Sequence, residues 1–165
     1  MKIVRETGSH FDLAEEDARR LLEEVLARPL FAHLATDSDD GPRESPVWFL
    51  WEGGRLWVIG NYETDSFPRR VEREPRCAVG VVDFDVSTGL VRHVGMRGRA
   101  YLEPHDRERL TRLLSRYMGE INRWDERFVE ILGDAAYVFV RFEPETVVVR
   151  DQSYRVGRSP EAEQK

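Results

Sequence analysis

The first hydrophobic positions of the chain follow a helical spacing. Between a candidate N-cap at Asp12 and a stop at Pro29, apolar residues recur at intervals of three and four. They are Ala18, Leu21, Leu22, Val25 and Leu26. This spacing predicts an amphipathic helix that buries a single stripe of side chains.

Most of the later apolar positions form short runs separated by turn-forming segments such as DSDDGP and EGG. The runs are residues 30–36, 44–51, 55–60, 76–84, 90–102, 135–142 and 146–150. Such runs are typical of antiparallel strands. Helical stretches at 66–75, 106–118 and 123–132 do not alternate with them as they do in parallel α/β folds. The pattern predicts a mainly β fold, an antiparallel barrel of six or seven strands with helices packed outside.

The run 90–102 presents two unlike faces, because side chains alternate along a strand. Its even positions are apolar or small except for Arg92, whereas its odd positions include His93, Arg97 and Arg99. One face is therefore predicted to be core and the other polar. A polar face is ordinarily solvated. The gap at Gly95 would also suit a flat ligand, and the spacing leaves both interpretations open.

Length and composition narrow the class of protein. The 165 residues, 19.3 kDa, predict one domain over residues 1–154 and a polar, mobile tail over 155–165. The net charge of −6 argues against general binding to nucleic acid or anionic membranes. No apolar stretch is long enough to span a bilayer, and no signal core is present at the start. A single cysteine, Cys77, argues for a reducing compartment, so we expect a cytoplasmic protein.

Residues 60–70, GNYETDSFPRR, place an amide, hydroxyls and two arginines directly after an apolar run. Backbone N–H groups at a helix start, the Ser66 hydroxyl and the guanidinium groups of Arg69 and Arg70 could hold a phosphate. Alternatively, Ser66 is only an N-cap and the arginines are solvated and pair with Glu72 or Glu74. Residue types alone do not choose between these two interpretations.

Other chemistries find no support in the motifs. The histidines at 10, 33, 93 and 105 lack metal-ligand spacing, so no metal site is expected. The chain has no GxSxG motif, and Cys77 has no base beside it. The glycine-rich GMRG lacks the lysine and hydroxyl of a phosphate-binding loop. No catalytic residue is assigned.

The order and spacing of RESPVWFLW, DSFPRRVEREPRCAVGVVDFD and HVGMRGRA resemble the pyridoxamine 5′-phosphate oxidase-like, FMN-binding split-barrel superfamily, over roughly residues 12–150. The resemblance implies a homodimer with FMN in a groove between two barrels. The cofactor residues that it implies are Arg43, Pro46, Val47, Trp48, Gly60, Asn61, Ser66, Arg69, Arg70 and His93.

Within this set, the resemblance implies that Pro46, Val47 and Trp48 border the flavin ring and that His93 approaches it. Phosphate binding is implied for the turn at Ser66 and the arginines. The chain departs from the family at Phe67, where a lysine is typical. It also lacks the C-terminal substrate motif of true pyridoxamine phosphate oxidases, so that activity is not expected.

The function implied is flavin redox chemistry, in which hydride passes from a reduced nicotinamide donor to a small-molecule acceptor. No side chain need act as an acid or base. The alternatives are a deazaflavin- or heme-binding member of the same fold, a non-catalytic flavin-binding or stress-related protein, and a barrel that has lost its cofactor and acts in protein interactions.

Overall fold

The computed structural model describes residues 1–3 and 15–157. Its helices are α1 (Glu15–Ala27), α2 (Ser66–Arg73), α3 (Arg107–Met118) and α4 (Glu126–Glu130), with 3₁₀ turns η1 (Ile121–Arg123) and η2 (Ile131–Gly133). Its strands are β1 (Lys2–Ile3), β2 (Ala32–Thr36), β3 (Arg43–Val47), β4 (Leu50–Glu52), β5 (Arg55–Asn61), β6 (Arg76–Asp85), β7 (Leu90–Glu103) and β8 (Tyr137–Asp151). The expected N-cap at Asp12 and the tail from residue 158 lie outside the described residues.

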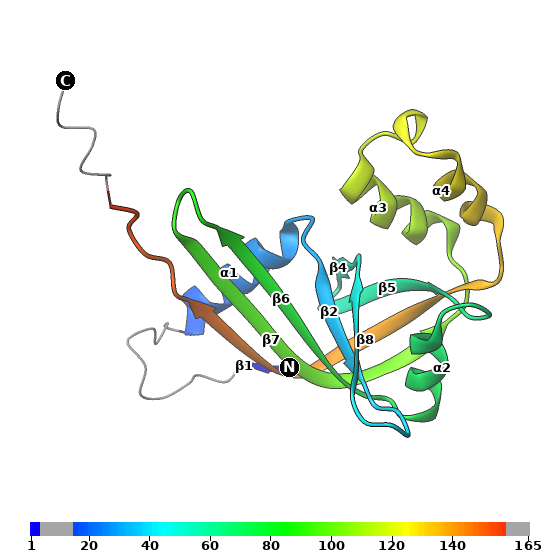
Figure 1. The fold of residues 1–165 in the computed structure, drawn as a ribbon, viewed down its shortest axis with the longest axis horizontal. Helices are drawn as coiled ribbons and strands as arrows, with labels where there is room; N and C mark the ends of the chain where they lie inside the picture. The colour runs from blue at the N-terminus through cyan, green and yellow to red at the C-terminus, as the bar shows by residue number, and fades with distance from the viewer. Residues whose placement is uncertain (4–14, 158–165) are drawn as a thin grey trace.

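One curled sheet organises the described chain, in the order β3-β2-β6-β7-β8-β5-β4. Neighbours along this path are antiparallel, while β1 pairs in parallel with β8. The long strands β7 and β8 bend so that the sheet forms a half-barrel with helices around it (Figure 1). This confirms the predicted mainly β, antiparallel split barrel.

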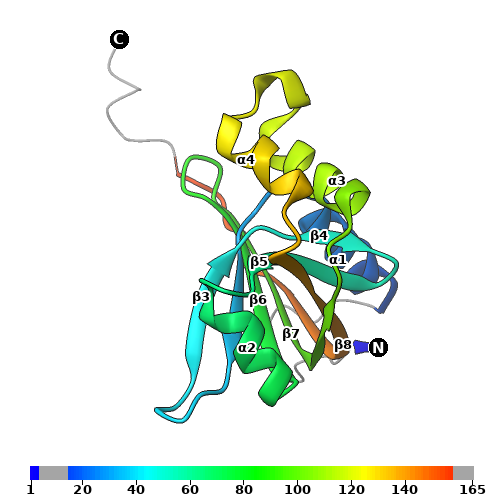
Figure 2. The same cartoon turned by 90° about the vertical axis from the view of Figure 1, so that its right-hand side faces the viewer.

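The helices cover the sheet in separate places. The predicted stripe of α1 is buried from Ala18 to Leu26 and packs into the main core inside the curl. Helices α3 and α4 form a lobe beside β4 and β5, and α2 lies on the other side of β5 (Figures 1 and 2). A second cluster under this lobe buries Trp57 and Trp124. The two tryptophans are therefore packing residues.

The two faces of β7 agree with the alternation read from the sequence. Val94, Met96 and Ala100 are buried, whereas Arg97 and Tyr101 are exposed. The outward face of this strand is therefore polar, and it carries His93.

Three element boundaries differ from the prediction. The runs 135–142 and 146–150 form one strand, β8, that continues through Pro144, because a register shift opposite Gly98 accommodates the proline. The run 44–51 is divided into β3 and β4 at Phe49, whose N–H donates to the Tyr117 hydroxyl at 3.0 Å. The helix expected over 123–132 is interrupted: η1 ends at Arg123, α4 begins after its N-cap Asp125, and η2 follows from Ile131. No helix in the described ranges is long and apolar enough to cross a membrane.

Candidate functional site

A hollow of about 580 Å³ opens at the edge of the sheet between β3, the turn before α2, and α4. We call it the edge hollow. Its lining comprises Phe31, Ser45, Pro46, Val47, Trp48, Ile59, Thr64, Asp65, Ser66, Phe67 and Phe128. The structure thus brings together the segments 45–48 and 64–67, which both carry predicted cofactor residues.

The guanidinium of Arg70 lies among hydroxyl groups at this edge. Its Nε donates to Thr36 Oγ1 at 2.7 Å, one Nη donates to Ser66 Oγ at 2.5 Å, and the other lies 3.5 Å from Ser45 Oγ. Ser45 and Ser66 both line the edge hollow. Arg70 is therefore positioned to neutralise an anion that binds against these two serines.

The charge of Arg70 lacks a carboxylate partner among the described residues: none of the ion pairs there includes it. Partial burial lowers the pKa of Arg70, and the nearby charges of Arg43 and Arg73 lower that pKa further. Arg43 is exposed at the start of β3, 3.6 Å from Asp40, and Arg73 pairs with Asp39 at 3.0 Å. A bound anion would relieve the repulsion among these three cations.

Helix α2 begins one residue earlier than the N-cap interpretation of Ser66 requires. The N-cap is Asp65, and Ser66 is the first helical residue. The Asp65 carboxylate accepts from the Asn61 N–H at 2.8 Å and does not cap the helix. It therefore leaves the N–H groups of Ser66 and Phe67 available at the positive end of the helix. Pro68, the next residue, has no N–H.

Three other predicted residues shape the turn rather than the hollow. Asn61 Oδ1 accepts from the N–H groups of residues 63 and 64, at 2.9 and 3.1 Å. Arg69 donates to the carbonyls of Tyr62 and Glu63 at 2.6 and 2.9 Å. A Cβ on Gly60 would lie 2.4 Å from Phe67 Cζ, so Gly60 lets α2 pack closely on β5. Arg69 and Arg70 thus have different partners despite their adjacency.

Trp48 and Phe128 line one wall of the edge hollow and belong to an aromatic stack with Tyr117. The Trp48 ring lies 4.6 Å from the Tyr117 ring at an interplanar angle of 4°, and 5.6 Å from the Phe128 ring. The Tyr117 hydroxyl donates to the Leu30 carbonyl at 2.7 Å, which ties α3 to the start of β2. Sequence reasoning missed Tyr117 and Phe128, because both belong to the α3–α4 lobe and carry no local signal of a site on β3. Pro46 is exposed and Val47 is buried at the same edge.

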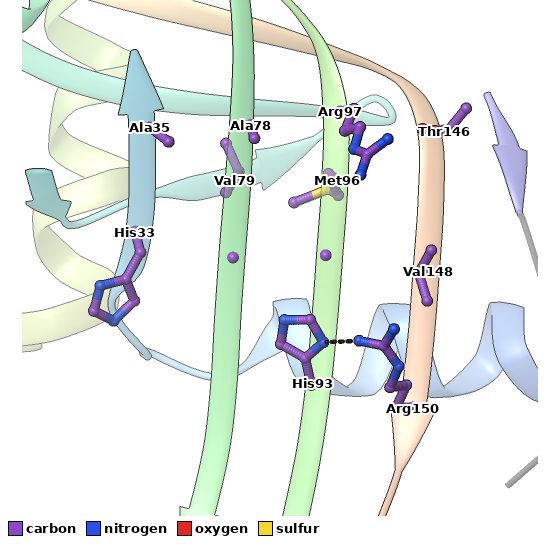
Figure 3. Close-up of a pocket in the computed structure, with 12 residues that line it drawn as sticks. His33, Ala35, Ala78, Val79, His93, Met96, Arg97, Thr146, Val148 and Arg150 are labelled. Carbon is purple, nitrogen blue, oxygen red and sulfur yellow. Dashed lines mark hydrogen bonds between the residues drawn. The ribbon is translucent and has the colours of Figure 1, made fainter. Parts of the chain in front are cut away.

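His93 lies in a different hollow, of about 610 Å³, on the outward face of β2, β6, β7 and β8 (Figure 3). We call it the outer-face hollow. The strand order separates β3 from β7 by three steps of roughly 4.8 Å, or about 14 Å. Arg150 donates to His93 Nδ1 at 3.4 Å, and burial, with the Arg150 charge, lowers the pKa of His93. Within one chain, His93 and the edge hollow are therefore separate.

No group of three or more His, Cys, Asp or Glu side chains in the described part of the chain could hold a metal ion. The buried thiol of Cys77 has its pKa raised to about 11 by burial and by the charge of Glu74. These residues offer no metal or thiolate chemistry beside the two hollows.

Comparisons with known proteins agree with this architecture. A conserved hypothetical protein, Rv2991 from Mycobacterium tuberculosis, superimposes with a TM-score of 0.68 at 20% identity, over 93% of this chain and 98% of its own. An F420 reductase superimposes with a TM-score of 0.60 at 26% identity, over 76% of this chain and 94% of its own. An FAD-binding protein from Mesorhizobium loti superimposes with a TM-score of 0.60 at 20% identity, over 86% of this chain and 96% of its own.

No curated protein matches the chain. The sequence profile of the family described as pyridoxamine 5′-phosphate oxidase matches residues 18–151. This range runs from within α1 to the last residue of β8 and includes both hollows. The chain therefore belongs to the pyridoxamine 5′-phosphate oxidase family.

Proposed function

We propose that the protein binds a flavin-type cofactor, FMN, in the edge hollow and uses it for redox chemistry. The observation that carries this proposal is Arg70, a cation without a carboxylate partner among the described residues that lies beside Ser45 and Ser66. The hollow, about 580 Å³, is within the range of cofactor sites. Arg70, which lies behind the two serines of the lining, and the aromatic side chains of Trp48 and Phe128 suit a molecule with a phosphate at one end and a flat ring at the other.

Each side of the hollow would have its own role. Arg70, the two serine hydroxyls and the first N–H groups of α2 would bind the phosphate. Pro46 and Trp48 would border the ring and exclude water from it. When bound, a flavin accepts hydride from a reduced donor and passes electrons to an acceptor. We propose a reduced nicotinamide as the donor and a small molecule as the acceptor, which makes the protein an oxidoreductase.

The presence of Phe67 gives Arg70 a larger share in binding the cofactor phosphate. Phe67 stands where the family typically has a lysine, and its side chain is buried against Gly60. It contributes no charge to the phosphate. Neutralisation of the phosphate would therefore fall to Arg70, with Arg43 as a more distant contributor.

A deazaflavin is the second candidate cofactor, favoured by the 26% identity with an F420 reductase. F420 is a deazaflavin that also carries a phosphate, so Arg70, Ser45 and Ser66 would bind that phosphate in the same way. Because the ring systems differ in their absorption, the two cofactors are readily told apart.

We also propose that the protein is a homodimer whose partner covers the edge hollow. Strand β3 is at the end of the strand order, and the side chain of Phe31 beside it is 53% exposed. Sedimentation equilibrium should give twice the chain mass of 19.3 kDa. A monomeric mass at micromolar concentration would overturn the dimer while leaving the cofactor proposal to be tested separately.

The cofactor is tested by the absorption spectrum of the purified protein, with mass identification of any chromophore released on denaturation. Protein without chromophore is then titrated with FMN, F420 and heme. Binding of FMN near one per chain, followed by turnover with NADH or NADPH and a dye acceptor, supports the proposal. FMN binding without turnover indicates a non-catalytic flavin-binding protein, and failure to bind any of the three contradicts the cofactor proposal.

A further inference from the structure

A single histidine joins the two connections between the α3–α4 lobe and the sheet. The chain leaves the sheet after β7 through residues 104–106 and returns to it before β8 through residues 134–136 (Figure 2). His105 lies in the first connection, and both of its ring nitrogens contact carbonyl oxygens of the returning chain. Its Nε2 is 3.0 Å from the Leu132 oxygen, and its Nδ1 is 3.2 Å from the Tyr137 oxygen. His105 therefore links the two connections at the base of the lobe.

The protonation of His105 decides how many of these contacts are hydrogen bonds. A carbonyl oxygen only accepts, so each contact needs a proton on the ring nitrogen. The imidazolium carries both protons and donates to both oxygens. The neutral ring carries one proton, so the lone pair of its other nitrogen faces a carbonyl oxygen at 3.2 Å or less. Both contacts are therefore satisfied only by the charged ring.

No carboxylate is paired with His105 in the described ranges, since none of the ion pairs there includes it. The charged and titratable side chains on the adjoining segments are Glu103, Asp106, Arg107, Glu108, Asp134 and Tyr137. Three of the four carboxylates accept hydrogen bonds from other groups, and Glu108 is exposed. The two backbone carbonyls are therefore the acceptors that the fold presents to the His105 ring.

The segment of α4 and η2, residues 126–133, depends on this contact for its attachment. Within the described chain, its hydrogen bonds to residues distant in sequence both end on the Leu132 carbonyl, from His105 and, at 3.5 Å, from Arg107. Helix α3 is attached independently, because Glu52 on β4 pairs with two of its arginines at 3.4 and 3.0 Å. Loss of the His105 bond would therefore loosen α4 and η2 before it loosened α3.

The same segment carries part of the wall of the edge hollow. Phe128 lines the hollow beside Trp48, and both rings pack against the cluster that buries Leu132. We propose that His105 is a pH-dependent clamp, whose charged ring holds α4 and η2 in place and whose loss of a proton as pH rises releases Phe128 from the wall. The clamp itself needs no cofactor, and its effect on flavin binding rests on the proposed function.

The clamp is tested on ¹⁵N-labelled full-length protein, as purified, between pH 5 and 8.5. Long-range ¹H–¹⁵N spectra report the protonation of each ring nitrogen, and amide spectra report the carbonyl contacts. We expect both nitrogens of His105 to be protonated at low pH and one of them to lose its proton as pH rises. The amides of Gly133 and Val138, which follow the two accepting carbonyls, should shift with the same midpoint, and the Phe128 amide should shift with them.

Two variants assign the effect to one ring. His105→Gln keeps a donor at the site but removes the titrating proton, so the pH-dependent shift of Gly133 should be lost. His33→Gln removes an exposed imidazole that bonds the Glu44 carboxylate, and it should leave the midpoint at Gly133 unchanged. If His105→Gln does not fold, the coupled titration of ring and amides in the wild type still decides the question.

The effect on the hollow is measured with riboflavin, because the phosphate of FMN has a pH dependence of its own. The wild type should bind riboflavin about fivefold more weakly at pH 8 than at pH 6, whereas His105→Gln should bind it equally at both.

Several results would overturn the clamp. These are a His105 ring whose protonation stays the same from pH 5 to 8.5, a ring that titrates while the Gly133 and Phe128 amides do not, or a Gly133 shift that persists in His105→Gln. Riboflavin affinity that is equal at pH 6 and pH 8 in the wild type would overturn the effect on the hollow. Failure to bind any flavin would contradict the proposed function, and the spectra of the ring and amides would still test the clamp.

Discussion

At the scale of single residues, the adjacent arginines of α2 show what a sequence motif leaves open. Neighbouring positions on a helix point about 100° apart, so only one of two can face a given hollow. Arg70 contacts the hydroxyls of Thr36 and Ser66, while Arg69 holds the turn through two carbonyls. The motif predicted guanidinium groups near the turn. Which of the two arginines faces the edge hollow depends on a tertiary contact, the hydrogen bond from Arg70 to Thr36 on β2.

His93 links a local contact to the pH dependence of stability. Burial lowers the pKa of His93 below its ordinary value of 6.5, and the Arg150 charge lowers it further. The unfolded chain therefore binds the proton more readily than the folded one, and this residue destabilises the fold as pH falls below about 6.5. We expect His93→Gln to lose less stability than the wild type between pH 7.5 and 5.5 in urea denaturation. Equal losses of stability in the variant and the wild type would contradict the lowered pKa of His93.

Cys77 should be inert in the folded protein. Its thiol is buried and its pKa is about 11, so the thiolate fraction at pH 8 is roughly one in a thousand, against about a quarter for an ordinary thiol. Alkylation by iodoacetamide at pH 8 should be about a hundredfold slower, or more, than in guanidinium-unfolded protein. Similar rates in the two states would show that Cys77 is accessible and reactive.

At the scale of elements, the bulge between β7 and β8 is a tightly constrained junction. A Cβ on Gly98 would lie 2.0 Å from the Glu143 carbonyl oxygen, a backbone atom that cannot move aside. Gly98→Ala should therefore lower the free energy of unfolding by about 3 kcal/mol or more. Gly80→Ala, in the neighbouring strand with its nearest contact at 4.0 Å, is the matched control and should change stability by less than about 1 kcal/mol. Equal effects in chemical denaturation would contradict this account.

The same junction shows which elements a sequence can predict. Alternation along residues 90–102 correctly separated the buried side chains of Val94 and Met96 from exposed Arg97, because sheet faces follow local periodicity. The continuity of β8 through Pro144 was not predicted, since it depends on a register shift against β7, a partner distant in sequence. The division at Phe49 likewise depends on Tyr117, 68 residues away.

At the scale of the whole molecule, the fold places two hollows on different faces of one sheet. The family resemblance predicted the barrel and put Ser66 and Arg70 in one site. It also grouped His93 with them in a groove between two barrels; strand order separates β7 from β3 within one chain, so this grouping stays a prediction about the dimer. The aromatic wall came from the α3–α4 lobe, whose Phe128 reaches the hollow only after folding. Topology, which local patterns do not encode, thus decides which predicted residues share a site.

The central claim is that Arg70 and its hydroxyl partners hold the phosphate of a flavin. It is tested most directly by calorimetric affinities for FMN and for riboflavin, which lacks the phosphate, in the wild type, Arg70→Ala and the control Arg20→Ala. The account predicts that the wild type and the control prefer FMN by about tenfold or more, and that Arg70→Ala loses most of this preference. A wild type that binds both flavins equally, or a preference that survives in Arg70→Ala, would contradict it.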